Sequence, residues 1–322
     1  MANTQDIRRR IKSVSNTAQI TNAMQLVAAS KMKKAQDLAT SGRPYADLLN
    51  KVLVRLKAHS DDGLVNIGDS GIDVMVRRED PAGEEEQPLH EEGEEGGKTL
   101  VVVITTDKGL CGGLNTNLMR KVTEAGNAGT AYVTVGRKGR QTLARLKKNL
   151  VADFEVSDPV KFGEAKLVAK FAMDKFLIGE YDRVQVAFTS FITTLSQKPM
   201  LETLLPICPI DLGRDRGFGG MGGDSEPTEA VPSDAEAGEY LFEPNAAHVL
   251  GTVVPQYVNY QVFQMMQESR ASEHSARMVA MKSATDNAKE MIKGLKLEYN
   301  KIRQAAITTE LLDITTAMRA LD

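Results

Sequence analysis

Few residues in this sequence are of types and spacings that could do chemistry, and the most suggestive are glycines. A β-branched run at 98–106 is followed by the glycine-rich turn GLCGG at 109–113 and then by a helical stretch to about Gly126. A turn of this kind could offer backbone N–H groups to a phosphate at the N-terminus of a helix. It lacks the GxGxxG spacing and the later acidic residue of dinucleotide-binding proteins, so it does not predict a dinucleotide site.

A second glycine-rich segment, GEEGGKT at 93–99, is similar to a phosphate-binding P-loop but differs from it in three respects. It is one residue short between its outer glycines, and it places Glu94 and Glu95 where phosphates would lie. It also precedes a strand, whereas a P-loop follows one. We therefore expect this chain to bind no nucleotide directly and no cofactor.

The side chains that could act as catalytic groups or metal ligands are scattered along the chain. The four histidines are His59, His90, His248 and His274. They form no HExxH or Cys-His arrangement, and GxSxG is absent. His274 lies beside Glu273 and Arg277 on a predicted helix, where a solvated or interface histidine is expected rather than a ligand. Cys111 and Cys208 form no CxxC pair, which indicates a reducing environment. The sequence predicts no catalytic residue and no metal site.

The elements that would position these residues begin and end with long amphipathic helices. Residues 256–322 contain no proline and one glycine, Gly294, and would extend on the order of 100 Å if helical throughout. The stripe expected on this helix is Ala284, Ala288, Met291, Leu295, Tyr299, Ile302 and Ala306. The first 41 residues carry a matching stripe, which steps by four and three through Ile7, Ile11, Val14 and Ala18. It is expected to continue through Ile20, Met24 and Val27 to Ala28, Met32 and Ala35. An antiparallel coiled coil of the two chain ends is the simplest arrangement.

Between these helices, strand patterns alternate with helical ones. Strands are expected at 98–106, 130–135 and 183–191, and a helix at 160–178. This alternation predicts a small Rossmann-like α/β domain with a largely parallel sheet. The predicted organisation is a coiled-coil helix at 1–60, an acidic flexible insertion at 61–97, the α/β domain at 98–212, a Gly/acidic insertion at 213–238 and a coiled-coil helix at 239–322.

Charge is unevenly distributed, although the formal net charge is only −3. Residues 7–36 include seven basic residues and no acidic one, whereas 79–95 include nine acidic residues and no Lys or Arg. The overall balance favours neither nucleic acid nor an anionic membrane as a partner. No apolar run approaches the roughly 20 residues of a membrane-spanning helix. The first residues also lack the apolar core of a signal peptide, so we expect a cytoplasmic protein.

Three motifs resemble those of the gamma subunit of F-type ATP synthases, of the bacterial type. IRRRIKSV, QITNAM and VAASKMKKAQ, within 7–36, resemble that family's N-terminal helix. TTDKGLCGGLN at 105–115 resembles its central signature, and segments 272–287 and 299–311 resemble its C-terminal helix. The resemblance covers nearly the whole chain except the two insertions.

The resemblance implies that the chain is a central rotor shaft with no active site of its own. In this family the terminal helices form an antiparallel coiled coil inside a hexamer of alternating alpha and beta subunits. The α/β domain contacts the epsilon subunit and the ring of c subunits. Rotation driven by ion flow couples that flow to ATP synthesis or hydrolysis in the beta subunits. The chain would lie at the cytoplasmic face of the inner membrane, attached only through the complex.

The resemblance also implies which residues contact the hexamer. Met24 and Arg277 match positions close to an acidic lever segment of a beta subunit. The lysines that supply positive charge suited to this lever are Lys12, Lys31, Lys33 and Lys34. The polar positions that meet catch loops of the hexamer are Arg303, Gln304, Thr308 and Glu310.

Some features depart from the family pattern. Met318 stands near the tip of the C-terminal helix where a small residue is more usual, and the insertions contain no cysteine for a thiol switch. The acidic insertion is hypothesised to modulate ATP hydrolysis by repelling the acidic levers, with a passive solvated loop as the alternative. Two other functions remain open on the residues alone: a nucleotide-dependent enzyme, and a homo-oligomeric coiled-coil scaffold.

Overall fold

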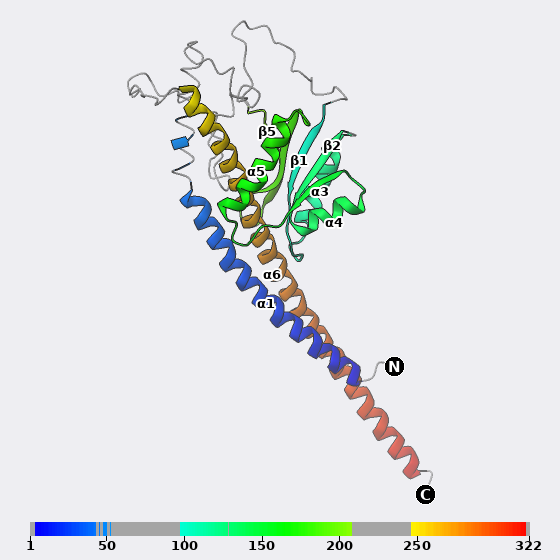
Figure 1. Cartoon of the computed structure of the whole chain (residues 1–322). Helices are drawn as coiled ribbons and strands as arrows, with labels where there is room; N and C mark the ends of the chain where they lie inside the picture. Colours follow the sequence, from blue (N-terminus) through cyan, green and yellow to red (C-terminus); the bar gives the residue numbers. More distant parts are fainter. Residues whose placement is uncertain are drawn as a thin grey trace. The chain divides into compact units, whose positions relative to one another are not determined.

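The computed structural model describes residues 4–42, 45, 48–49, 52, 97–127, 129–207 and 246–319 (Figure 1). The predicted insertion 213–238 and all of 61–97 except Gly97 lie outside these residues, as do His59, His90 and Cys208. The hypothesis about the acidic insertion therefore stays a hypothesis. The chain divides into two compact units, one of residues 1–30 and 277–322 and the other of residues 31–276.

The larger unit contains a five-stranded sheet with strand order β3-β2-β1-β4-β5. The first three strands in the chain are β1 (Thr99–Ile104), β2 (Thr130–Val135) and β3 (Leu150–Phe154). They are followed by β4 (Arg183–Phe191) and β5 (Gln197–Leu205). The pairs β1–β2, β1–β4 and β2–β3 are parallel, and only β5 runs antiparallel, against β4. The expected largely parallel sheet is confirmed.

The sequence analysis identified β1, β2 and β4 but missed both edge strands. β3 is a short LVADF segment that is mostly half-buried, and β5 mixes polar residues with Pro199. An edge strand needs to pair on one side only, so it tolerates proline and lacks the continuous apolar run of a central strand. The sheet order therefore could not be read from strand patterns alone.

Three helices connect the strands of this unit. They are α3 (Leu114–Ala125), α4 (Arg137–Arg145) and α5 (Phe162–Leu177), in agreement with the expected alternation. Alternate residues of β1 face opposite sides of the sheet. Val101 and Val103 pack against α3 and α4, whereas Leu100, Val102 and Ile104 belong to the larger core under α5. Burial on both faces explains why the central strands are continuous apolar runs.

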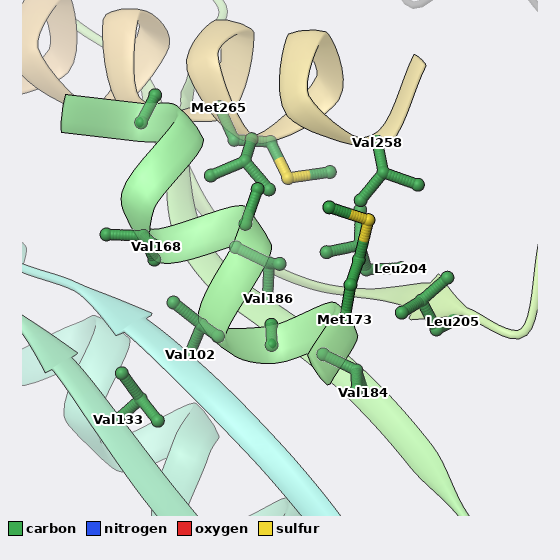
Figure 2. Close-up of a cluster of buried hydrophobic side chains, with 14 of the residues drawn as sticks. Val102, Val133, Val168, Met173, Val184, Val186, Leu204, Leu205, Val258 and Met265 are labelled. Atoms are coloured by element: carbon green, nitrogen blue, oxygen red, sulfur yellow. The ribbon is translucent and has the colours of Figure 1, made fainter. Parts of the chain in front are cut away.

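The larger core includes residues from the long C-terminal helix. Figure 2 shows Val168 and Met173 of α5 beside Val258 and Met265, which belong to α6 (Ala246–Arg319). α6 has 74 residues and contains Pro255, so it begins before the proline-free segment from which it was predicted. Proline in a helix removes one backbone hydrogen bond, which the packing of this segment offsets.

The N-terminal helix, α1 (Thr4–Ser41), runs antiparallel to α6. In the smaller unit, the hydroxyl oxygens of Thr21 and Thr285 are 2.7 Å apart. In the larger unit, Ala35 packs against Ala271, and the Tyr260 hydroxyl donates to the Gly42 carbonyl at 2.7 Å. Residues of increasing number along α1 thus contact residues of decreasing number along α6. The expected fold class is confirmed.

The seam of this pair agrees with the expected stripe of α1 at both ends and differs from it in the middle. Along α1, buried and half-buried residues step by four and three: Ile7, Ile11, Val14, Ala18, Thr21, Gln25, Ala28, Met32 and Ala35. Ile20 and Val27 are 60% and 57% exposed, so their placement on the seam was wrong. On α6, five residues of the expected stripe are buried or half-buried: Ala284, Ala288, Leu295, Tyr299 and Ile302. Met291 is 56% exposed and Ala306 is also exposed, whereas Ile292 is half-buried. The step of 3.5 residues that a left-handed coiled coil requires takes the seam through polar Thr21 and Gln25.

Candidate functional site

The glycine-rich turn after β1 forms hydrogen bonds within itself. Asn115 Nδ2 donates to Thr106 Oγ1 at 2.7 Å, and Thr106 Oγ1 donates to the Lys108 carbonyl at 2.8 Å. Leu110 and Gly112 both have positive φ, which lets the chain reverse before α3. The polar side chains of the motif therefore build the turn, and its role in this fold is structural.

The start of α4 lies very close to the end of β1. A Cβ atom on Gly136, whose φ is +103°, would lie 2.4 Å from the Thr105 carbonyl oxygen. The backbone N–H of Gly139 donates to Thr105 Oγ1 at 2.8 Å. Only glycines allow this approach, which seats α4 over the carboxyl end of β1.

Within the described residues, no cluster of three or more His, Cys, Asp or Glu side chains could hold a metal ion. Across the same part of the chain, no helix is both long enough and apolar enough to cross a membrane.

The surfaces of α1 and α6 contain the residues predicted to contact partner subunits. Seven basic residues of α1 are exposed: Arg8, Arg9, Arg10, Lys12, Lys31, Lys33 and Lys34. Met24 is half-buried, and Arg277 is largely buried. At the far end of α6 every residue of 303–316 is exposed, including Arg303, Gln304, Thr308 and Glu310.

Large apolar residues are also exposed at this end of α6. Leu311, Leu312, Ile314 and Met318 are each more than half exposed. Their exposure agrees with an interface that is filled only when a partner is present. The Thr308 hydroxyl donates to the Gln304 carbonyl at 2.9 Å, which leaves its oxygen able to accept a further hydrogen bond.

Lys31 has a partner within the chain. Its Nζ donates to Asp158 Oδ2 at 2.7 Å, and the other carboxylate oxygen lies 3.4 Å from His274 Nε2. The hydrogen bond to His274, supported by Lys31, holds the pKa of Asp158 well below its usual range, although burial acts in the opposite direction. Asp158 is therefore ionised at neutral pH and competes with any acidic partner for Lys31.

A largely buried arginine lies one helical turn from His274. Arg270 Nη1 donates to Glu273 Oε2 at 2.8 Å, and Nη2 donates to Asp107 Oδ2 at 3.1 Å. Burial acts to lower the pKa of Arg270, but the two carboxylates outweigh burial and raise it. The sequence analysis did not single out Arg270, Asp107 or Asp158. Asp107 lies inside the matched motif TTDKGLCGGLN, which could have drawn attention to it.

Comparisons with known proteins agree with this geometry. A family model described as ATP synthase matches residues 3–321. The ATP synthase gamma chain of Akkermansia muciniphila is 45% identical over 322 residues and covers 100% of both chains. That of Opitutus terrae is 43% identical over 320 residues and covers 99% of each chain.

Solved structures have a similar fold. A chain of the Euglena gracilis mitochondrial ATP synthase, in the structure of its OSCP/F1/c-ring in rotational state 3, gives a TM-score of 0.65 at 20% identity. The match covers 99% of this chain and 94% of that one. A chain from the rotor of the same synthase in rotational state 1 gives a TM-score of 0.58 at 17% identity, covering 94% and 98%.

Proposed function

The chain belongs to the ATP synthase gamma chain family, and we propose that it works as the central rotor shaft of a bacterial F-type ATP synthase. It is a non-catalytic subunit, which couples transmembrane ion flow to ATP synthesis or hydrolysis in partner subunits. Its partners are the alpha and beta subunits of the hexamer, the epsilon subunit and the ring of c subunits.

The observation that carries this proposal is the exposed end of α6. Residues 303–316 form regular helix although all of them are exposed, and several are large and apolar. A helix with no tertiary packing is marginal in water, and an exposed apolar surface of this kind is typical of an interaction site. The hexamer of alpha and beta subunits would surround this end of α6 and bury it on every side.

Coupling follows from the difference between the surfaces of the two helices. α1 presents exposed basic residues such as Arg9 and Lys33, whereas α6 presents Leu311, Ile314 and polar neighbours. A beta subunit therefore contacts a different surface at each angle of rotation. Such contacts shift the equilibrium of a catalytic site only by the difference in their free energies between its states. An asymmetric shaft can thus drive three identical sites through different states in turn.

Individual contacts are proposed from the family motifs and the exposure of each residue. Lys12 and Lys33 are exposed and available to an acidic lever of a beta subunit, and Lys31 can reach it if it leaves Asp158. Met24 and Arg277 are proposed to line the same zone. The contacts proposed for the catch loops of the hexamer are Arg303, Gln304, Thr308 and Glu310.

The α/β domain is proposed to lie outside the hexamer, where it contacts the epsilon subunit and the c ring. Exposed apolar residues of this domain include Leu167, Ile178 and Leu195. The chain is proposed to be peripheral at the cytoplasmic face of the inner membrane, held there only through the complex. We propose that it binds no nucleotide and no nucleic acid itself.

The test is affinity purification of the tagged chain from native membranes, with identification of the co-purifying subunits and an ATPase assay. A photoreactive amino acid at Gln304, on the exposed end of α6, is expected to crosslink to an alpha or beta subunit. The same probe at Arg145, an exposed position of α4, is the matched control and is expected to crosslink to neither. Recovery of the chain alone, or only with copies of itself and without ATPase activity, would favour the homo-oligomeric scaffold.

A further inference from the structure

A buried charged network joins α6 to the loops that follow β1 and β3. The side chains of Arg270 and Glu273 are only 9% and 5% exposed. Arg270 Nη2 donates both to Asp107 Oδ2 and to the Val156 carbonyl, each at 3.1 Å. Asp107 in turn accepts the backbone N–H of Arg137 at 3.2 Å, at the start of α4. One guanidinium thus binds α6 to two loops at the carboxyl edge of the sheet.

A second charged contact extends the same attachment to α1. Asp158 lies two residues after Val156 in the loop after β3. Its carboxylate accepts a hydrogen bond from Lys31 of α1 at 2.7 Å and lies 3.4 Å from His274 of α6. Both terminal helices therefore bind the same loop, and all of these residues lie within the larger unit.

These polar contacts and the apolar core serve different purposes. The core between α5 and α6, which includes Val258, Val262 and Met265, provides stability, but apolar contacts are non-directional. A buried ion pair contributes little net stability, because desolvation offsets the attraction, yet removing one partner leaves an uncompensated charge. Charge-assisted hydrogen bonds from a planar guanidinium also have a fixed geometry. The network around Arg270 is therefore suited to fixing the register of α6 against the sheet.

We propose that Arg270 is a positioning residue for rotary coupling, which holds α6 in register with the α/β domain so that torque applied to the domain turns the helices. Asp107 and Glu273 hold its guanidinium, and Asp158 performs the same task for α1 through Lys31. This inference rests on the proposed function of the chain as the rotor shaft.

The experiment uses the assembled ATP synthase in inverted membrane vesicles and measures ATP-driven ion uptake per ATP hydrolysed. In Arg270→Met, this coupling ratio is expected to fall at least roughly threefold while ATP hydrolysis persists, because α6 loses its fixed register against the sheet. The control is Arg140→Met, which removes the ion pair between Arg140 of α4 and Asp153 inside the α/β domain. Its Nη1–Oδ2 distance of 2.8 Å equals the Nη1–Oε2 distance between Arg270 and Glu273. This control is expected to retain the wild-type ratio.

A conservative variant separates positioning from general damage to the fold. Arg270→Lys keeps the charge but loses the planar fork, so it is expected to recover part of the coupling ratio. If Arg270→Met prevents assembly, the same ratio is measured for Asp107→Asn, which removes one partner carboxylate at a side chain one-third exposed. That ratio must also fall for the proposal to stand.

Two results would overturn the proposal in distinguishable ways. The first is an Arg270→Met or Asp107→Asn complex whose coupling ratio equals that of a coupled wild-type complex. This result would reject the positioning role and leave the shaft function intact. A wild-type chain that neither assembles with alpha and beta subunits nor supports ion uptake would reject the proposed function itself.

Discussion

At the scale of single residues, this chain uses its chemically suggestive side chains for structure. Thr106 and Asn115 of the glycine-rich turn form a hydrogen bond with each other, and Asp107 binds Arg270 of α6. Glu164, near the start of α5, accepts hydrogen bonds from Ser157 and from the Lys161 backbone N–H. Burial acts to raise the pKa of Glu164, but these hydrogen bonds lower it overall. These side chains fix turns and helix ends.

Gly136 offers the sharpest test of this structural role. Gly136→Ala is expected to destabilise the purified chain by about 1–3 kcal/mol, because its φ is +103° and a Cβ would lie 2.4 Å from the Thr105 carbonyl oxygen. Denaturant unfolding followed by circular dichroism measures the change. Gly163→Ala in α5, where a Cβ meets nothing within 4 Å, is the control and is expected to leave stability unchanged or raise it by up to about 1 kcal/mol. Equal effects of the two substitutions would contradict the prediction.

The lowered pKa of Asp158 predicts how the free energy of unfolding depends on pH. Its folded-state pKa is depressed, chiefly by the hydrogen bond with His274 and then by Lys31, so its contribution is present above the unfolded pKa of about 3.8. That contribution is lost as the pH falls from about 4 towards the folded-state pKa. Urea midpoints measured from about pH 7 to 3 are therefore expected to fall less steeply at the acid end in Asp158→Asn. Asp286→Asn, an exposed position of α6, should keep the wild-type profile, and an unchanged profile in Asp158→Asn would refute the prediction.

At the scale of elements, the middle of the seam between α1 and α6 contains small and polar residues. Ala18 and Ala28 of α1 are buried, and Thr21 meets Thr285 across the seam. Thr21 and Thr285 also lie within hydrogen-bond distance of the carbonyls of Ala18 and Met281, at 3.1 and 2.8 Å. Small seam residues let the helices approach closely, and the threonine pair specifies the register at one point.

Ala28 tests how tightly this seam is packed. Ala28→Leu is expected to destabilise the chain by about 1–3 kcal/mol, because the larger side chain must force the helices apart at a position only 2% exposed. Ala23→Leu, on the exposed side of α1, is the matched control and should change stability by less than about 0.5 kcal/mol. Thermal unfolding followed by helical circular dichroism distinguishes them, and a neutral Ala28→Leu would indicate a loosely packed seam.

At the scale of the whole molecule, the chain leaves surfaces that it cannot cover itself. The formal net charge is −3, yet α1 exposes seven basic residues. Residues 303–316 of α6 are exposed throughout, whereas its earlier residues Met281, Thr285 and Ala288 are buried. Such a distribution is typical of a subunit whose interfaces are filled only in an assembly.

Hydrogen exchange should reveal this dependence on partners. In the free chain, the amides of 303–316 are expected to exchange faster than those of 281–292, because an unpacked helix opens easily. In the assembled complex the exchange of 303–316 should slow, while β1, buried in the middle of the sheet, serves as the internal reference and stays unchanged. Mass spectrometry of the free chain and of the complex measures both segments. Identical exchange at 303–316 in the two samples would contradict burial of this end.

Local features of the sequence were sufficient to predict most of the elements. The apolar runs of β1, β2 and β4 and the helical periodicity of α1, α5 and α6 depend on neighbouring residues, and they appear where expected. The edge strands β3 and β5 were missed because an edge strand satisfies weaker local rules. The predicted contact residues, from Met24 to Glu310, remain predictions, since their partners are other subunits.

The sequence by itself determined most of the elements, the antiparallel pairing of the chain ends and the family, because apolar periodicity and motifs are local properties of the sequence. Only the tertiary structure decided which residues form the middle of the seam and which charges meet. Arg270 binds Asp107 and the Val156 carbonyl across 163 and 114 positions of the chain, and Lys31 reaches Asp158 across 127. Contacts at such separations arise from how the helices pack on the sheet, and no local pattern encodes them.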